Sequence, residues 1–332
     1  MADSFPCYLV HEESGRKVAS VRQITRDDLP QGEVLIRVAY SSLNYKDALA
    51  ATGHPGVVKR LPHVPGIDAA GTVEQSATEQ FKPGEQVIVT GYELGATHWG
   101  GYSRYIRVPA DWVVPLPEGL SPFESMALGT AGFTAAQCVL ALLEHGLQPA
   151  DGEVVVTGAT GGVGSLSVAL LAKQGISVTA VTGKPHEREF LEQLGAHEIV
   201  GREAVDDTSG NPLLPARWAG AVDTVGGSVL STLLRSTGHR GCVAACGLVA
   251  GDELRLTVYP FILRGVTLAG IDSAHCPMDR RLEIWSKLAG PWKLDQLTAL
   301  VKTISLSELD REIRTILAGG QRGRVVVEPV ES

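Results

Sequence analysis

Val154-Val155-Val156-Thr157-Gly158-Ala159-Thr160-Gly161-Gly162-Val163-Gly164 decides the fold, because β-branched residues lead into a glycine cluster and then into the helix-forming residues 165–173. The pattern predicts a strand, a phosphate loop and a helix. Gly161 suits a tight turn, Gly162 lets a pyrophosphate approach the main chain, and Gly164 allows strand and helix to pack closely. Free N–H groups at the start of such a helix bind anions. The residues predicted to bind the cofactor phosphates are Thr160, Gly161, Gly162 and Val163.

A second strand follows at Ser177-Val178-Thr179-Ala180-Val181, which completes a βαβ unit of about 30 residues. Ala159 takes the place of the first glycine of the common dinucleotide fingerprint. Glycine clusters also serve ordinary turns, and the flanking strand and helix are what favour a nucleotide site. The sequence therefore predicts an α/β Rossmann domain with a doubly wound parallel sheet.

The end of the second strand, Thr182-Gly183-Lys184, lacks the Asp or Glu that would bind the 2′-hydroxyl of NAD. A hydroxyl and an ammonium suit a 2′-phosphate, so we expect NADPH. Arg202, after the expected third strand at 198–200, is a second candidate for the adenosine end. The alternatives are that Lys184 is a solvated cap of the helix at 185–194 and that Arg202 is an ordinary surface arginine.

The length of 332 residues predicts two domains, and the composition, 44% hydrophobic and 20% charged, is that of a globular protein. The net charge of −8 argues against nucleic acid or an anionic membrane as the main partner. No apolar run approaches the roughly 20 residues of a membrane span, and the N-terminus Met1-Ala2-Asp3-Ser4 does not resemble a signal peptide. We expect a cytoplasmic protein. Its odd number of cysteines, five, lacks Cys-x-x-Cys spacing and predicts free thiols.

Two kinds of pattern divide the chain. Short β-like runs separated by Gly and Pro, at 33–38, 70–74 and 86–90, predict a β-barrel-like first domain. Helices alternate with apolar strands from about 125 to 290. An amphipathic helix at 306–317 and a strand at 323–327 form a tail that we expect to return to the first domain. The expected domains are therefore residues 1–124 with 294–332, and residues 125–293.

Several segments, in order along nearly the whole chain, carry a family resemblance: Ser42-Leu43-Asn44-Tyr45-Lys46-Asp47, Val64-Pro65-Gly66-Ile67-Asp68-Ala69-Ala70-Gly71, Val89-Thr90-Gly91-Tyr92-Glu93-Leu94-Gly95, Trp99-Gly100-Gly101-Tyr102 and Gly129-Thr130-Ala131-Gly132-Phe133-Thr134-Ala135. The chain resembles the zinc-free medium-chain dehydrogenase/reductases of the quinone oxidoreductase class, and within that class the NADPH-dependent acryloyl-CoA reductases. The resemblance implies a GroES-like barrel as the catalytic domain and reduction of acryloyl-CoA to propanoyl-CoA. By analogy we expect a homodimer, paired through the apolar strand at 266–270.

Zinc-dependent relatives place a cysteine ligand where Asn44 stands and a Gly-His-Glu motif where Gly66-Ile67-Asp68 stands. We therefore expect no metal, and the absence of these ligands argues against Lewis-acid activation of an alcohol. Metal-free hydride transfer to a C=C bond conjugated to a thioester carbonyl remains. Two alternatives stay open: a quinone or free-enone reductase with the same cofactor, and a non-catalytic NADPH-binding protein of the same fold.

The resemblance suggests that Asn44 lies near the nicotinamide, where its amide can donate a hydrogen bond. Tyr45 is expected to contact the cofactor or to donate a proton, unless it is a half-buried packing residue. Asp47 either fixes Lys46 or the loop, or forms a plain surface salt bridge, which is the commoner role. Thr130, after Gly129, either orients the nicotinamide end or acts as a helix N-cap.

The ends of the late strands carry further candidates. Gly247-Leu248 and Ile271-Asp272-Ser273 follow strands of the nucleotide sheet, where ligands gather. The resemblance places their main chain along the nicotinamide half of the cofactor, whereas by position alone each could be an ordinary loop. Arg324 resembles an arginine that reaches the cofactor phosphates, unless it is a surface strand residue. The proton donor is not assigned, since His54-Pro55 stands where related enzymes have a tyrosine. Basic residues available for the CoA phosphates are Lys59, Arg60 and Arg264.

Overall fold

The computed structural model describes residues 4–295 and 297–330, and its contacts divide the chain into two compact units. The first unit comprises residues 1–130, 274–291 and 295–332, and the second comprises residues 131–273 and 292–294. The helix α7 (Met278–Ala289), expected in the nucleotide-binding domain, groups with the first unit. The N-terminal Met1-Ala2-Asp3 lies outside the described residues.

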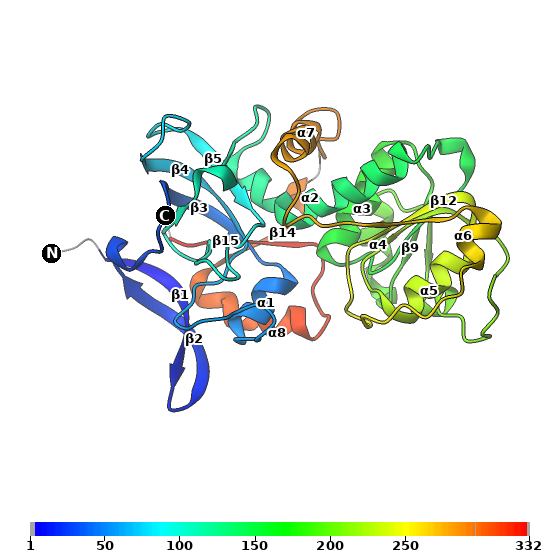
Figure 1. Cartoon of the computed structure of the whole chain (residues 1–332), viewed down its shortest axis with the longest axis horizontal. Helices are drawn as coiled ribbons and strands as arrows, with labels where there is room; N and C mark the ends of the chain where they lie inside the picture. The colour runs from blue at the N-terminus through cyan, green and yellow to red at the C-terminus, as the bar shows by residue number, and fades with distance from the viewer. Residues whose placement is uncertain (1–3, 296, 331–332) are drawn as a thin grey trace. The chain divides into compact units, whose positions relative to one another are not determined.

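The second unit contains a six-stranded parallel sheet with the order β10-β9-β8-β11-β12-β13. Figure 1 labels two of these strands, β9 and β12. Its strands are β8 (Val154–Val156), β9 (Val178–Val181), β10 (Glu198–Val200), β11 (Trp218–Asp223), β12 (Thr237–Ala245) and β13 (Thr267–Gly270). Its helices are α3 (Gly162–Lys173), α4 (Arg188–Gln193), α5 (Gly227–Ser236) and α6 (Tyr259–Arg264), with 3-10 turns that include η4 (Pro185–Glu187) and η5 (Arg202–Val205). The predicted doubly wound fold is confirmed.

The central strand β8 is the reason that the glycine loop decides the fold. All three of its valines are fully buried, and it lies between β9 and β11. The chain leaves β8 toward β9 and β10 on one side and returns to β11 on the other, so the order of the strands reverses at β8. Ligands of such sheets bind beyond the carboxyl ends of the strands at this reversal, where residues 157–161 lie.

The first unit is built on a seven-stranded sheet with the order β14-β15-β3-β4-β5-β7, with β6 paired to β3. Its strands are β3 (Val34–Ser42), β4 (Asp68–Ser76), β5 (Gln86–Thr90), β6 (Tyr105–Val108), β7 (Val114–Pro115), β14 (Val301–Ser305) and β15 (Arg324–Glu328), beside a hairpin of β1 (Phe5–Glu13) and β2 (Arg16–Ile24). Two apolar clusters form its core, one around Leu43 and Val327 and the other around Ile36 and Val89. The helix α1 (Tyr45–Ala51) follows β3 directly.

The tail of the chain does return to the first sheet. β15 pairs antiparallel with β3, in a register that sets Val326 opposite Ser42. The predicted helix at 306–317 is a short 3-10 turn, η7 (Leu306–Glu308), followed by α8 (Leu309–Leu317). This pairing brings Arg324, at the start of β15, to the end of β3.

One expectation about apolar runs is wrong. The helix α2 (Pro122–Glu144) is long and apolar enough to cross a membrane by length and composition alone. Its most apolar 18-residue window is 78% buried inside the protein, as in the core helix of a globular protein. The helix is also interrupted at Gly129, whose φ of 52° and ψ of −156° are not helical.

Candidate functional site

Asp68 is the centre of a buried polar cluster in the first unit. Its side chain is fully buried, and its Oδ2 accepts hydrogen bonds from the Asn44 amide at 2.8 Å, the Ser42 hydroxyl at 2.5 Å and the Thr130 N–H at 2.9 Å. The Thr130 hydroxyl donates to Oδ1. Asp68 opens β4 and Ser42 closes β3, so the pairing of these two strands sets the geometry. One carboxylate therefore holds two of the predicted site residues, Asn44 and Thr130.

Asp47 belongs to the same cluster, and its interpretation as a surface salt bridge is wrong. The residue is fully buried, and its Oδ1 accepts the N–H groups of Gly66 and Ile67 at 3.0 and 2.8 Å. Its Oδ2 accepts the N–H of Asn44 at 2.8 Å. Burial, and then the charge of Asp68, raise the pKa of Asp47 to about 7, although the N–H donors oppose the shift. Asp47 thus ties the start of α1 to the loop before β4.

Arg324 is not a surface residue, since it is only 1% exposed. Its guanidinium donates to the carbonyl oxygens of Ala127 and Leu43, to the Oδ1 of Asn44 at 3.2 Å and to the Ser42 hydroxyl at 2.8 Å. Burial lowers the pKa of Arg324, while Asp68 and Asp47 raise it. The guanidinium is therefore the counter-charge of the two buried carboxylates, and the structure engages it there instead of presenting it to a phosphate.

The remaining residues predicted in the first unit lie around this cluster. Asn44 is 9% exposed and is the N-cap of α1, so its role as a turn former and its place in the polar cluster are both observed. Tyr45 begins α1 and is 42% exposed. Thr130 follows the break at Gly129, where an added Cβ would lie 2.6 Å from Asp68 Oδ2 and 2.9 Å from Arg324 Nη2. Only glycine allows α2 to approach the cluster so closely.

Sequence reasoning did not assign roles to Ser42, Asp68 and Tyr102. The hydroxyl of Tyr102 donates to the Ser42 carbonyl at 3.2 Å, and Ser42 joins Asp68 to Arg324. All three residues stand in the segments that carry the family resemblance, but only their pairing in space shows that they act together.

Metal-ligand chemistry does not fit these residues. Asn44 and the Gly66-Ile67-Asp68 segment offer an amide and a carboxylate that are already hydrogen-bonded within the cluster. In the described ranges 4–295 and 297–330, no group of three or more His, Cys, Asp or Glu side chains could hold a metal ion.

In the second unit, the glycine loop has the shape that a dinucleotide requires. A Cβ on Gly164 would lie 2.2 Å from the carbonyl oxygen of Gly158, so the start of α3 packs directly on the loop. Gly161 is the N-cap of α3, and the first N–H groups of this helix follow at Gly162 and Val163. This arrangement fits an anion at the helix N-terminus.

The residues predicted for the adenosine end come together at the ends of β9 and β10. A pocket of about 480 Å³ is lined by Thr182, Gly183, Pro185, Arg188, Ile199, Val200, Gly201, Arg202 and Glu203. The Arg202 guanidinium packs against Gly183, where a Cβ would lie 2.6 Å from its Nε.

Lys184 is half-buried as the N-cap of η4, not a fully solvated cap. Burial lowers the pKa of Lys184 and Arg202 lowers it further, while Glu187 opposes both. Arg202 lines the pocket, and Lys184, which follows Gly183, is near enough to Arg202 for the two charges to interact. Two neighbouring cations of this kind fit a phosphate.

The predicted nicotinamide contacts follow β12 and β13. Gly247 packs on Thr224, at the end of β11, so closely that a Cβ would lie 1.9 Å from the Thr224 carbonyl oxygen. Leu248 is 65% exposed. Ile271 and Ser273 follow the end of β13, and the Ile271 N–H donates to the Ala245 carbonyl. These residues share the carboxyl edge of the sheet with the glycine loop.

The structure also bears on two further expectations, the state of the cysteines and the basic residues available for the CoA phosphates. All five cysteines are free thiols. Among the basic residues considered for the CoA phosphates, Arg264 donates to the carbonyl oxygens of Arg235, Thr237 and Leu214, so its guanidinium is committed to the fold. Lys59 donates to the Pro55 carbonyl and Arg60 is exposed.

Comparison with known proteins gives matches to both units. The alcohol dehydrogenase GroES-like domain matches residues 30–118, and the family described as zinc-binding dehydrogenase matches residues 162–286. Acrylyl-CoA reductase AcuI of Ruegeria pomeroyi is 50% identical over 317 residues, 96% of each chain. YhfP of Bacillus subtilis, described as a putative quinone oxidoreductase, is 48% identical over 93% of this chain and 94% of its own.

Solved structures agree. The YhdH oxidoreductase of Salmonella enterica in complex with NADP has a TM-score of 0.95 at 44% identity, over 98% of this chain and 100% of that one. The structure of B. subtilis YhfP with NAD bound has a TM-score of 0.95 at 46% identity and the same coverage. The chain therefore belongs to the medium-chain dehydrogenase/reductase family, in the quinone oxidoreductase class and the branch that includes acrylyl-CoA reductase AcuI, YhdH and YhfP.

Proposed function

We propose that this protein is an NADPH-dependent reductase of the C=C bond of 2-enoyl thioesters, with acryloyl-CoA as substrate and propanoyl-CoA as product. The observation that carries the proposal is the 50% identity to acrylyl-CoA reductase AcuI over 96% of both chains. The buried cluster around Asp68 supports it, since it holds the two residues expected nearest to the reaction, Asn44 and Thr130.

The proposed reaction has two requirements, a hydride donor and hydrogen-bond donors for the substrate carbonyl. Bound NADPH supplies a hydride to the β-carbon of the substrate, and the charge that develops on the thioester carbonyl needs hydrogen-bond donors. One hydrogen of the Asn44 amide is committed to Asp68 at 2.8 Å, whereas Ser42 and Asp47 are more distant partners, at 3.3 and 3.2 Å. We assign the second hydrogen to the substrate carbonyl. Asp68 and Arg324 are then positioning residues, because they fix both ends of the amide.

The preference for NADPH is supported by Thr182, Lys184 and Arg202, and by the NADP complex of YhdH. The structure of YhfP holds NAD, so preference within the family has to be measured for each member. The contacts that we propose for the cofactor are Tyr45 and Thr130; Thr160, Gly161, Gly162 and Val163; Thr182, Gly183, Lys184 and Arg202; and Gly247, Leu248, Ile271 and Ser273. Arg324 is reassigned to positioning.

We propose further that the enzyme works without zinc, in the cytoplasm, and as a homodimer. The donor set at Asn44 and Asp68 supports the first point. β13 is an edge strand, and exposed apolar side chains precede it in the sequence, which supports the dimer. They are Leu248, Val249, Val258, Tyr259, Ile262 and Leu263.

A second candidate function is a quinone or free-enone reductase, which the description of YhfP favours. Oxidation of NADPH at 340 nm, with acryloyl-CoA, crotonyl-CoA, free acrylate and a simple quinone, separates the two. We expect kcat/KM for acryloyl-CoA to exceed the others at least tenfold. Equal or higher values with the quinone would favour the second candidate, and no turnover of any substrate would favour a non-catalytic NADPH-binding protein.

A further inference from the structure

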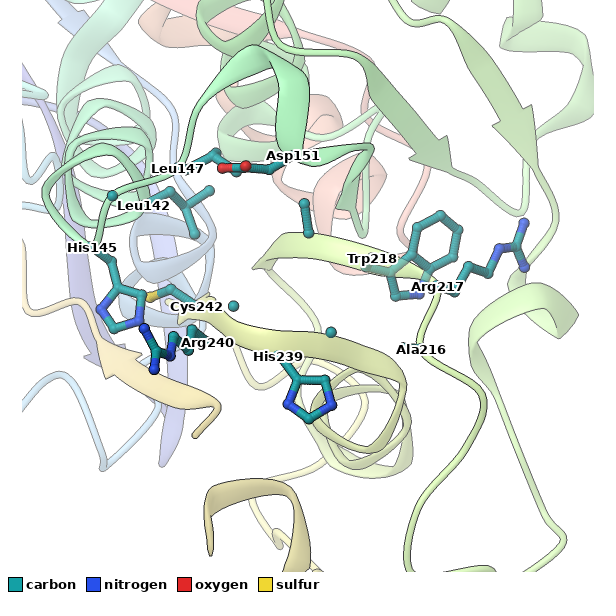
Figure 2. Close-up of a pocket in the computed structure, with 14 residues that line it drawn as sticks. Leu142, His145, Leu147, Asp151, Ala216, Arg217, Trp218, His239, Arg240 and Cys242 are labelled. Carbon is teal, nitrogen blue, oxygen red and sulfur yellow. The ribbon is translucent and has the colours of Figure 1, made fainter. Parts of the chain in front are cut away.

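A second pocket lies in the nucleotide-binding unit, at the amino ends of its strands (Figure 2). It has a volume of about 500 Å³ and a floor of buried side chains from Leu142, Leu147, Trp218 and Cys242. Its rim is polar and exposed, with His145, Asp151, Arg217, His239 and Arg240. An apolar floor with a few polar groups at the rim is typical of small-molecule sites.

The pocket is distinct from the dinucleotide site. Trp218, in its floor, begins β11, whereas Thr224, beside Gly247 and the glycine loop, follows the end of that strand. The six residues of β11 span about 17 Å from end to end. A ligand of this pocket therefore occupies the opposite edge of the sheet.

An interruption of the sheet forms one wall of the pocket. Trp218 pairs with Thr237 and Gly220 with Cys242, so residues 238–241 bulge out of β12. Within the bulge Arg240 has a φ of 58°, a left-handed conformation that is costly for a residue with a Cβ. The bulge presents His239 and Arg240 at the rim.

The bulge is held firmly. Arg264 donates two of its hydrogen bonds to the Arg235 and Thr237 carbonyls, at 2.9 and 3.1 Å, where the bulge begins. At the other end, a Cβ on Gly241 would lie 2.4 Å from the Thr237 side chain and 2.6 Å from the Ala219 carbonyl oxygen. The wall is thus preorganised, which lowers the cost of binding a ligand.

The basic side chains at the rim differ in whether they have a partner within the protein. Arg217, on the side of the pocket opposite Arg240 in Figure 2, stacks over Trp218 at 4.1 Å and faces Glu198 at 3.8 Å. Asp151 accepts the Gln148 N–H. In contrast, the side chains of His145, His239 and Arg240 make no hydrogen bond or ion pair with any residue in the described part of the chain. Figure 2 shows His145 and Arg240 next to each other at one side of the pocket, with His239 apart from them, so two donors without partners remain together at that side.

We propose that this pocket binds a small organic phosphate monoester, with its phosphate against Arg240 and His145 and its apolar body on the floor. The guanidinium can bind two of the three terminal oxygens of a phosphate at once, and the imidazole of His145 can donate to the third. The floor is lined by Leu142, Leu147, Trp218 and Cys242, which suits a compact apolar group and not a sugar.

The test is calorimetric titration of the NADP⁺-saturated protein with phenyl phosphate, with inorganic phosphate and benzoate titrated beside it. We expect one site per chain for phenyl phosphate, and at least a tenfold weaker affinity in Arg240→Gly. Glycine adopts a positive φ without strain, so this variant keeps or gains thermal stability. Arg240→Asn, which also tolerates this conformation, is a second variant should the first fail to fold.

Two control variants locate the site. Arg255→Ala removes an exposed arginine elsewhere in the same unit, and Arg202→Ala alters the nucleotide pocket; both should bind phenyl phosphate as the wild type does. Absence of binding at millimolar ligand, equal binding in Arg240→Gly, or loss of binding in Arg202→Ala would overturn the proposal. Tighter binding of benzoate would overturn the choice of a phosphate. None of these outcomes depends on turnover of acryloyl-CoA.

Discussion

The Asn44 amide donates to the Asp68 carboxylate over 2.8 Å, where zinc-dependent relatives of this family have a metal ligand and a Gly-His-Glu motif. The buried negative charge still needs a cation, and Arg324 supplies it from the tail of the chain. Arginine is always charged and cannot be lost to a chelator. The pairing of β15 with β3 is therefore part of the site as well as part of the fold.

Asp68→Asn should separate positioning from cofactor binding. An amide cannot accept from Ser42, Asn44 and Thr130 together, so the Asn44 amide loses its fixed orientation. We expect kcat to fall at least tenfold, KM for NADPH to change less than threefold, and stability to fall by about 1–3 kcal/mol. Steady-state kinetics and urea unfolding measure these values.

Asp111→Asn is the matched control, since Asp111 is an exposed acid of the same unit. It should leave kcat and stability unchanged. An Asp68→Asn enzyme with wild-type kcat would remove the positioning role, and full recovery of kcat in Asp68→Glu would show that charge alone suffices.

Lys184→Ala and Arg202→Ala should each raise KM for NADPH about tenfold, because each removes a charge-assisted bond to the 2′-phosphate. KM for NADH should stay within twofold, since NADH lacks that phosphate. The ratio of kcat/KM for the two cofactors measures the preference, with Arg255→Ala as a surface control. If NADPH preference survives in the double variant, these residues do not determine it.

Gly164→Ala should both destabilise the protein and weaken NADPH binding. The new Cβ would lie 2.2 Å from the Gly158 carbonyl oxygen, a backbone atom that cannot move without opening the loop. We expect a loss of about 1–3 kcal/mol in unfolding free energy. Gly270→Ala, with no atom within 4 Å of its Cβ, is the control in the same unit. A Gly164→Ala protein as stable as Gly270→Ala would show that close packing at the loop is not required.

Local signals predicted the nucleotide-binding half well. The sequence predicts β8, α3 and β9 because their valines, glycines and helix-forming residues are adjacent in the chain. It also predicts β10 with its observed bounds. The cluster around Asp68 could not be predicted in the same way. Its members lie on β3, β4, α2 and β15, and sequence alone does not show that Arg324 is brought to Ser42. The burial of Asp47 could not be predicted for a related reason. A short polar run in a sequence is typical of an exposed segment, and its burial becomes evident only when the loop that covers it is placed.

The proposed dimer makes a prediction about exposed apolar residues. Ile262 is 68% exposed, on α6 close to the edge strand β13. Ile262→Glu should dissociate a dimer, because a charge would be buried at the contact. Sedimentation velocity at micromolar concentration should give a dimer for the wild type and a monomer for the variant. A wild-type monomer would remove the proposal, and a dimeric variant would exclude this surface.

The buried carboxylate of Asp47 should make stability depend on pH. Its pKa is raised from 3.8 to about 7 in the folded protein, so between these values the native state binds more protons than the unfolded state. Its contribution is fully present below about pH 4 and is lost as the pH rises through about 7. Melting temperatures between pH 4 and 8 should therefore fall with pH more steeply in the wild type than in Asp47→Asn. Asp223, a buried acid with a raised pKa in the other unit, is present in both proteins, so its effect cancels in the difference. A difference that stays flat, or that favours the wild type as pH rises, would mean that the N–H donors of Gly66, Ile67 and Asn44 keep Asp47 ionised.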